Sequence, residues 1–148
     1  RTKNTGTFSP PAFFTQPGLS FGFQIGAEAV DLILLVMTQR GLESLLKDEL
    51  TLGADAAVSA GPVGRHAEAS TDIGMRGEIY SYSRSKGAFA GVSLKGTVLT
   101  TDKEANFAYY GRFFKAKDIL IRGKVKKIPK SGQQFIKRLN FLAPPKKK

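Results

Sequence analysis

Alternating apolar and polar side chains predict several β-strands, and most of them are built from small residues. One face of the stretch 50–60 consists of Leu50, Leu52, Ala54, Ala56, Val58 and Ala60. Residues 87–100 have a similar composition, and residues 20–29 and 77–87 also alternate, as half-buried strands do. The run AVDLILLVM at 29–37 is almost entirely apolar, which predicts a fully buried strand.

Three or four short helices are expected beside these strands. Leucines at helical spacing predict one helix over 40–50. A second is expected over 102–111, with Thr101 as its N-cap and Gly111 at its end. The third, 133–142, is amphipathic. Its apolar face consists of Phe135, Ile136, Leu139 and Leu142, and its polar face carries Lys137 and Arg138.

The strand pattern predicts an α+β fold with a mostly antiparallel sheet, because tight turns such as GPVG at 61–64 join consecutive strands. The Gly- and Ala-rich strands suggest a curved sheet or a barrel-like core. Three explanations fit such small side chains: close approach of a packed helix or second sheet, the bend of a tight barrel, or a lipid-like ligand chain. Close packing is the preferred explanation.

The net charge of +11 lies in the last quarter of the chain. Residues 1–111 carry 10 Lys/Arg and 11 Asp/Glu, a charge of −1, whereas residues 112–148 carry 13 Lys/Arg and one Asp, a charge of +12. Such asymmetry indicates a polyanionic partner, which is a membrane surface, a nucleic acid or an acidic protein. The alternative is a solvated basic tail.

Aromatic residues are interleaved with these cations, as at membrane interfaces. The candidate anion-binding residues are Arg112, Lys115, Lys117, Arg122, Lys124, Lys126, Lys127 and Lys130. Stacking on single-stranded nucleic acid is disfavoured, because the sequence contains no RNP, KH or helix-turn-helix pattern. A competing interpretation places Phe107, Tyr109 and Tyr110 in the core.

No pattern in the sequence predicts catalysis, a cofactor or a metal site. The chain has no Cys, one His (His66) and no G-x-S-x-G motif. Asp55, Glu68 and Asp72 match the spacing of no metal loop, so a solvated face is expected there. The longest apolar run is about half of the ~18 residues needed to span a membrane.

Four blocks together resemble the SYLF domain family, also called the Ysc84-like actin-binding or lipid-binding family. These blocks are IGAEAVDLILLVM, TLGADAAVSAGPVGR, YSRSKGAFAGVSL and YYGR, in family order. Bacterial members resemble the chain most. The resemblance implies a SYLF-like domain over 1–123 that lacks the family's usual N-terminal part. Residues 124–148 are then a basic C-terminal extension with a short amphipathic helix.

The resemblance implies a non-enzymatic module that binds anionic, phosphoinositide-like phospholipid at membrane surfaces. The alternative is an interaction module for an acidic protein or filament, which is actin in eukaryotic relatives. Arg65, Arg84 and Lys86 lie in the matching blocks and are further candidate anion-binding residues. The expected location is peripheral to a membrane: the cell envelope or periplasm in bacteria, or the cytoplasmic membrane face in eukaryotes.

Overall fold

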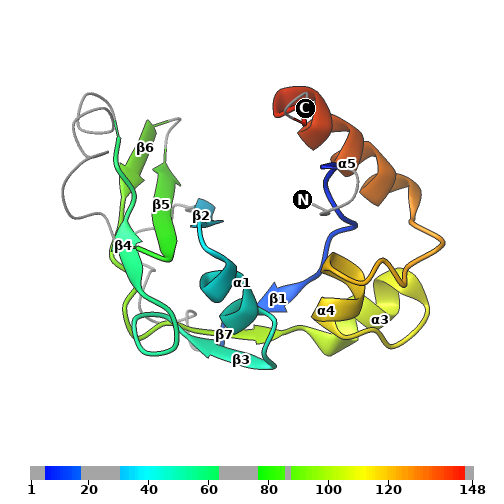
Figure 1. Ribbon diagram of the computed structural model, residues 1–148, viewed down its shortest axis with the longest axis horizontal. Coiled ribbons are helices and arrows are strands. Elements are labelled where there is room, and N and C mark those ends of the chain that lie inside the picture. Colours follow the sequence, from blue (N-terminus) through cyan, green and yellow to red (C-terminus); the bar gives the residue numbers. More distant parts are fainter. Residues whose placement is uncertain (1–5, 18–30, 64–76, 86–87, 146–148) are drawn as a thin grey trace. The chain divides into compact units, whose positions relative to one another are not determined.

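The computed structural model describes residues 6–17, 31–63, 77–85 and 88–145. The chain divides into two compact units (Figure 1). Unit 1 comprises Arg1–Thr15 and Thr101–Lys148, and unit 2 comprises Gln16–Thr100. Each unit has its own packing and is described separately.

A sheet centred on β5 forms most of unit 2. Strand β2 (Asp31–Val36) pairs antiparallel with β5 (Ile79–Ser85) along one edge. The other edge of β5 pairs first with β4 (Val58–Ala60), in parallel, and then with β6 (Ala88–Gly91), antiparallel. The sheet is therefore mixed, with the antiparallel pairing that the sequence predicts in the majority.

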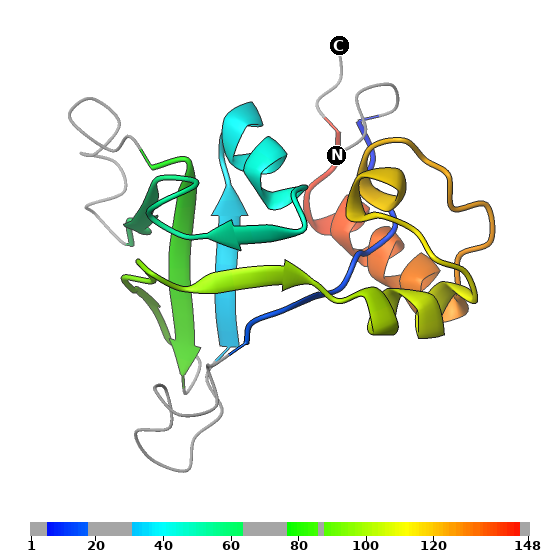
Figure 2. The same cartoon turned by 90° about the horizontal axis from the view of Figure 1, so that it is seen from below.

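A second strand pair covers one face of this sheet. Strand β3 (Glu49–Thr51) pairs antiparallel with β7 (Val98–Thr101), and both run across β2 and β5 in Figure 2. Helix α1 (Gln39–Leu45) connects β2 to β3 and begins at Thr38, whose hydroxyl accepts the Gly41 N–H at 3.0 Å. The buried core between the layers consists of Leu50, Leu52, Ala56, Val58, Ile79 and Leu94.

The predicted single strand over 50–60 is wrong, although most of its predicted inner face is buried. A tight turn interrupts it, in which Asp55 Oδ2 accepts the Thr51 N–H at 2.7 Å and Gly53 adopts a φ of +89°. The stretch 87–100 is likewise two strands, β6 and β7. Gly96, with a φ of +83°, lies in the turn that precedes β7. Positive φ favours glycine, so these two glycines mark turns rather than strand interiors.

Two further predictions for unit 2 need correction. Helix α1 ends at Leu45, before the predicted end, and Glu49 begins a strand. Strand β2 is present, but only alternate residues are covered: Ile33, Leu35 and Met37 are exposed on the face opposite the core. The prediction of a strand over 20–29 lies outside the described residues.

Close packing explains the small residues around β4 and β5. The Tyr82 ring lies directly over Gly61, where an added Cβ would overlap it. A Cβ at Gly77 would lie 2.8 Å from Cε1 of Tyr80, and one at Gly91 would overlap the Gly61 carbonyl oxygen. The glycines therefore make room for tyrosine rings and for backbone. The described strands close no barrel, so the barrel-like alternative is not confirmed.

Unit 1 contains the short strand β1 (Phe14–Thr15) and three helices: α3 (Lys103–Tyr110), α4 (Ala116–Leu120) and α5 (Lys130–Leu142). With α1, the described part of the chain holds four helices, and the predicted α+β class is confirmed. Helix α5 begins earlier than the predicted residue 133.

Asp102 caps α3, in place of the predicted Thr101. Its Oδ1 accepts the Ala105 N–H at 2.8 Å, which satisfies one of the free donors at the helix start. Gly111 ends the helix in the left-handed conformation, with a φ of +68°, as predicted.

The segment before β1 is held to the helices of unit 1 by polar side chains. Asn106 is fully buried, and its Nδ2 donates to the Phe13 carbonyl oxygen at 2.9 Å while its Oδ1 accepts the Phe13 N–H at 3.0 Å. The Tyr110 hydroxyl donates to the Pro11 carbonyl oxygen, and Asn140 Oδ1 accepts the Phe8 N–H. Chain ends far apart in sequence are thus joined within one unit.

Candidate functional site

Eight predicted anion-binding residues lie together in unit 1, between α3 and the start of α5. We call residues 112–130 the basic segment. Its cations are Arg112, Lys115, Lys117, Arg122, Lys124, Lys126, Lys127 and Lys130, all exposed. Asp118 is the only acidic residue in the segment, so its net charge is +7.

The backbone of the basic segment is anchored by apolar residues at three points. Helix α4 buries Ala116 and Ile119, and Val125 is buried in the loop that follows. The cations lie between and beside these buried positions. The segment therefore presents its charges from an ordered backbone, in contrast to the alternative of a solvated tail.

Asp118 organises two of the eight cations. Its Oδ1 lies 3.0 Å from both Arg122 Nη1 and Lys124 Nζ, and its side chain is 13% exposed. The hydrogen bond from Lys124, and then the one from Arg122, lowers the pKa of this carboxyl below its usual value. Asp118 is therefore a carboxylate at neutral pH and holds both cations at the loop.

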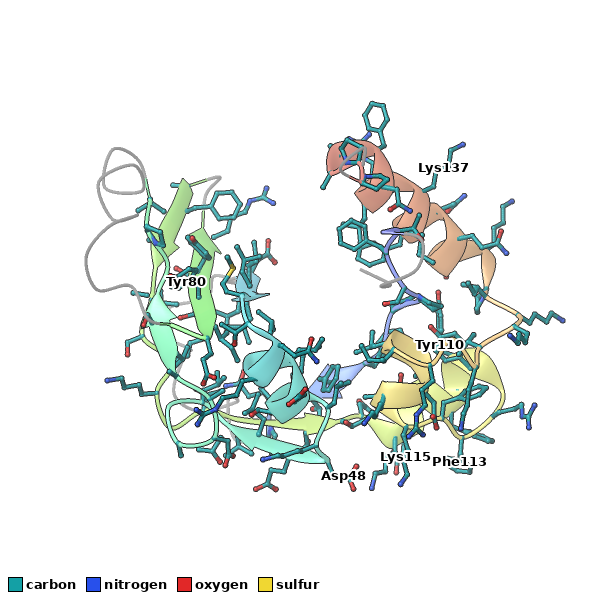
Figure 3. The ribbon with its side chains drawn as sticks, in the orientation of Figure 1. Asp48, Tyr80, Tyr110, Phe113, Lys115 and Lys137 are labelled. Carbon is teal, nitrogen blue, oxygen red and sulfur yellow. The ribbon has the colours of Figure 1, made fainter. Side chains whose placement is uncertain are left out.

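The other six cations have no ion pair with a carboxylate among the described residues. One of them has an aromatic partner, because the Arg112 guanidinium lies 5.9 Å from the centre of the Phe114 ring. Figure 3 shows Lys115 extending away from the ribbon at the outer edge of unit 1. This arrangement leaves several positive charges available to an anionic partner.

Arg84 belongs to unit 2, whereas the basic segment belongs to unit 1. Arg84 lies on β5, 4.0 Å from Asp31, and its guanidinium lies 5.9 Å from the centre of the Phe89 ring. The remaining two predicted residues, Arg65 and Lys86, lie outside the described residues.

The aromatic residues near the basic segment divide into two groups. Tyr109 and Tyr110 are half-buried, and burial, with a smaller contribution from Tyr109, raises the pKa of Tyr110 to about 12. Phe107 was a candidate core residue, and this is wrong: it is exposed and stacks on Phe113, which is more exposed still. The α3–α4 connection thus carries apolar surface beside its charges.

Helix α5 exposes a second apolar surface in the same unit. Phe135, Phe141 and Leu142 are all more than half exposed. Lys137 points away from the helix in Figure 3, and Arg138 lies 5.7 Å from the centre of the Phe141 ring. No acidic residue occurs in α5, so its solvent face is apolar and positive.

The described residues show no cluster of metal-ligand side chains: they contain no group of three or more His, Cys, Asp or Glu side chains that is suited to a metal ion. Asp55 accepts a backbone N–H within its own turn, while His66, Glu68 and Asp72 lie outside the described residues. No described helix is long and apolar enough to cross a membrane.

Asp118 and Asn106 are two structural residues of unit 1 that are not among the predicted site residues. The role of Asp118 had one visible signal, because it is the single acid among thirteen cations in residues 112–148. Asn106 gave none. An asparagine in an amphipathic helix usually faces solvent, and only the tertiary structure brings Phe13 to it.

Comparisons with known proteins identify the family. The family model Ysc84, described as "Las17-binding protein actin regulator", matches residues 17–141. The human SH3 domain-containing YSC84-like protein 1 is 38% identical over 116 residues, which cover 78% of this chain and 34% of that protein. LAS seventeen-binding protein 3 of Saccharomyces cerevisiae is 38% identical over 127 residues, or 84% of this chain and 28% of that protein.

The chain thus spans about a third of the length of the curated relatives it matches. No solved structure matches it significantly. That bacterial members are the most similar, and that a domain boundary falls at residue 123, remain predictions. The family resemblance itself is confirmed: this chain belongs to the Ysc84 (SYLF) family, whose description is that of an actin regulator.

Proposed function

We propose that this chain is a non-enzymatic binding module that recognises an acidic protein or filament through the basic segment. The observation that carries the proposal is the set of six exposed cations that pair with no carboxylate in the described part of the chain, on a backbone anchored by Ala116, Ile119 and Val125. An ordered array of like charges attracts a complementary surface and fixes its orientation.

Actin filaments are the first partner to test, because the family description names an actin regulator. The names of the yeast relatives, LAS seventeen-binding protein 3, point to a protein partner as well. Both descriptions support the acidic-protein interpretation over the phospholipid one.

Co-sedimentation with purified actin filaments tests the proposal. The double variant Lys126→Ala/Lys127→Ala is expected to bind roughly two- to tenfold more weakly, since two exposed charge contacts are removed. Binding of the wild-type chain is expected to fall with added salt, because the screening length shortens to about 10 Å at 0.1 M.

The matched control is Lys47→Ala/Lys95→Ala, which removes the same charge from exposed positions of unit 2. It is expected to bind as the wild type does. Equal losses in both double variants would show that only the total charge matters, and binding that is independent of salt would overturn the proposal.

Anionic phospholipid is the second candidate partner, and α5 is the observation that favours it. Exposed Phe135, Phe141 and Leu142 beside Lys137 and Arg138 form the apolar and cationic surface that interfacial helices use. In this case the chain would be a peripheral membrane protein, on the cytoplasmic membrane face in a eukaryote or in the envelope in a bacterium.

Vesicle co-sedimentation tests this second candidate. Binding is expected to rise when phosphatidylserine or a phosphoinositide is mixed into phosphatidylcholine vesicles, at ~1 kcal/mol for each Lys or Arg that reaches the surface. Phe141→Ser/Leu142→Ser is expected to weaken it. Equal binding to vesicles of phosphatidylcholine alone would exclude recognition of anionic headgroups.

A further inference from the structure

Helix α3 and its connection to α4 present two stacked aromatic rings to solvent, Phe107 from the helix and Phe113 from the connection. The ring centres of Phe107 and Phe113 are 4.4 Å apart, and the ring planes differ by 27°. Phe107 is 42% exposed and Phe113 is 76% exposed. Figure 3 labels Phe113 and Lys115, which both project from the connection between α3 and α4. We call Phe107 and Phe113 the ring pair.

The ring pair contributes little to the core of unit 1. The buried apolar residues of α4 are Ala116 and Ile119, and the one described ring that stacks on Phe113 is itself exposed. Leaving this much phenylalanine surface in water forgoes the free energy that its burial would supply. Exposed apolar surface of this kind, bordered by polar residues, marks sites of interaction.

Stacking also prepares the two rings for binding. Each ring restricts the other, so less side-chain freedom remains to be lost when a partner covers them. Aromatic and arginine side chains dominate the residues that carry most of the binding energy at protein interfaces. Both occur here, since Arg112 directly precedes Phe113 in the chain.

The charges around the ring pair define the partner. Arg112 and Lys115 lie next to it in sequence, and neither is paired with a described carboxylate. Glu104, one turn before Phe107 on α3, is the nearest acidic position of that helix. The basic segment continues from this point with a net charge of +7, so charge complementarity favours a negatively charged partner.

We propose that the ring pair anchors an acidic peptide segment that carries one large apolar side chain. The apolar side chain covers the rings, and flanking carboxylates pair with Arg112 and Lys115. This inference rests on the proposed binding of an acidic protein and adds the position of its apolar anchor. A segment of this kind matches both the exposed apolar rings and the positive charges beside them.

Two fluorescein-labelled peptides of glutamates test the proposal, one with a central Phe and one with Ala in its place. Fluorescence anisotropy is expected to show that the wild-type chain binds the Phe peptide about five- to tenfold more tightly. Phe113→Ala is expected to abolish this preference. Because Phe113 is largely exposed, the variant should keep the thermal unfolding temperature of the wild type.

Phe89→Ala is the matched control, because Phe89 is 51% exposed and lies on β6, outside the proposed binding surfaces. It should retain the full preference for the Phe peptide. Lys126→Ala/Lys127→Ala should weaken the binding of both peptides equally and leave the ratio of their two dissociation constants unchanged. If Phe113→Ala still preferred the Phe peptide, the proposal would be overturned. The same holds if this variant bound phosphatidylserine vesicles more weakly while its preference for the Phe peptide stayed intact.

The outcomes separate this inference from the proposed function. Salt-sensitive binding of both peptides with equal affinity would leave the basic segment as an acidic-protein site and remove the ring pair as its anchor. If the wild-type chain bound neither peptide and did not bind actin filaments, both the ring-pair inference and the proposed function would be wrong.

Discussion

Asp118 Oδ1 lies 3.0 Å from Nζ of Lys124, and the main chains of the same two residues are also joined. The Lys124 N–H donates to the Asp118 carbonyl oxygen at 3.1 Å. The last turn of α4 and the loop after it are therefore closed by both a backbone and a side-chain contact. The single acid of the basic segment thus orders the loop that carries the cations.

Asp118→Asn is expected to lower the stability of the protein at pH 7, since the amide holds Lys124 and Arg122 less strongly. The folded-state pKa of Asp118 is lowered, so the carboxylate stabilises the fold above the ordinary aspartate value of ~3.9. That contribution is lost as the pH falls through the lowered pKa. Urea unfolding at pH 7 and at lower pH values measures the difference.

The stability difference between wild type and Asp118→Asn should therefore narrow as the solution becomes acidic. Asp31→Asn is the control, because the Asp31 carboxylate lies 4.0 Å from Arg84 and both side chains are largely exposed. It should change stability little at any pH. A difference for Asp118→Asn that stays constant from pH 7 to strongly acidic solution would contradict the assigned role of the ion pairs.

How much of the fold the sequence predicts depends on the range of the forces involved. Periodicity identifies β5 and α5, because burial of one face is encoded locally. The turn at Gly53 is different: Leu50, Leu52, Ala56 and Val58 are all buried, although the turn interrupts the strand between them and Ala54 is exposed. A period-two pattern therefore does not reveal where a strand is interrupted.

The residues of the candidate site are likewise predicted only in part. Charge clustering identifies the eight cations of the basic segment, because sequence neighbours remain neighbours in a short loop. Arg84 is predicted on other grounds, from its place in a family-like block, and it lies on a strand of unit 2. The exposure of Phe107 could not be predicted either, since aromatic residues in a short helix usually face a core.

Replacing Asn106 is expected to destabilise the protein by about 1–3 kcal/mol, because the Phe13 N–H would lose its acceptor and three side-chain hydrogen bonds of a buried residue would be removed. Asn106 Nδ2 donates to the carbonyl oxygens of Phe13 and Asp102, and its Oδ1 accepts the Phe13 N–H. The variant Asn106→Leu, of similar volume, leaves the Phe13 N–H without its acceptor, whereas the carbonyl oxygens of Phe13 and Asp102 keep the backbone donors Asp102 N–H and Asn106 N–H. Urea unfolding followed by circular dichroism gives the free energy.

Asn140→Ala is the comparison for this prediction, because Asn140 is only partly buried and makes a single backbone contact, with the Phe8 N–H. A loss of about 1 kcal/mol is expected there. Equal losses at the two positions would mean that burial does not set the strength of these contacts.

Gly61→Ala tests whether the small residues exist to receive tyrosine rings. An added Cβ would overlap the Tyr82 ring, and Gly61 has no unusual backbone conformation that would by itself exclude alanine. Tyr82 cannot simply swing away, because its hydroxyl donates to the Pro62 carbonyl oxygen at 3.2 Å. Overpacking is expected to cost about 1–3 kcal/mol of unfolding free energy.

A double-mutant cycle with Tyr82→Ala separates the steric effect from any other effect of the substitution. Once the ring is removed, Gly61→Ala should cost little, and the added methyl group should fill part of the space that the ring leaves. The two substitutions are therefore expected to be strongly non-additive in urea unfolding. Additive losses would mean that Gly61 is needed for its backbone freedom, and the tyrosine-over-glycine explanation of this sheet would have to be abandoned.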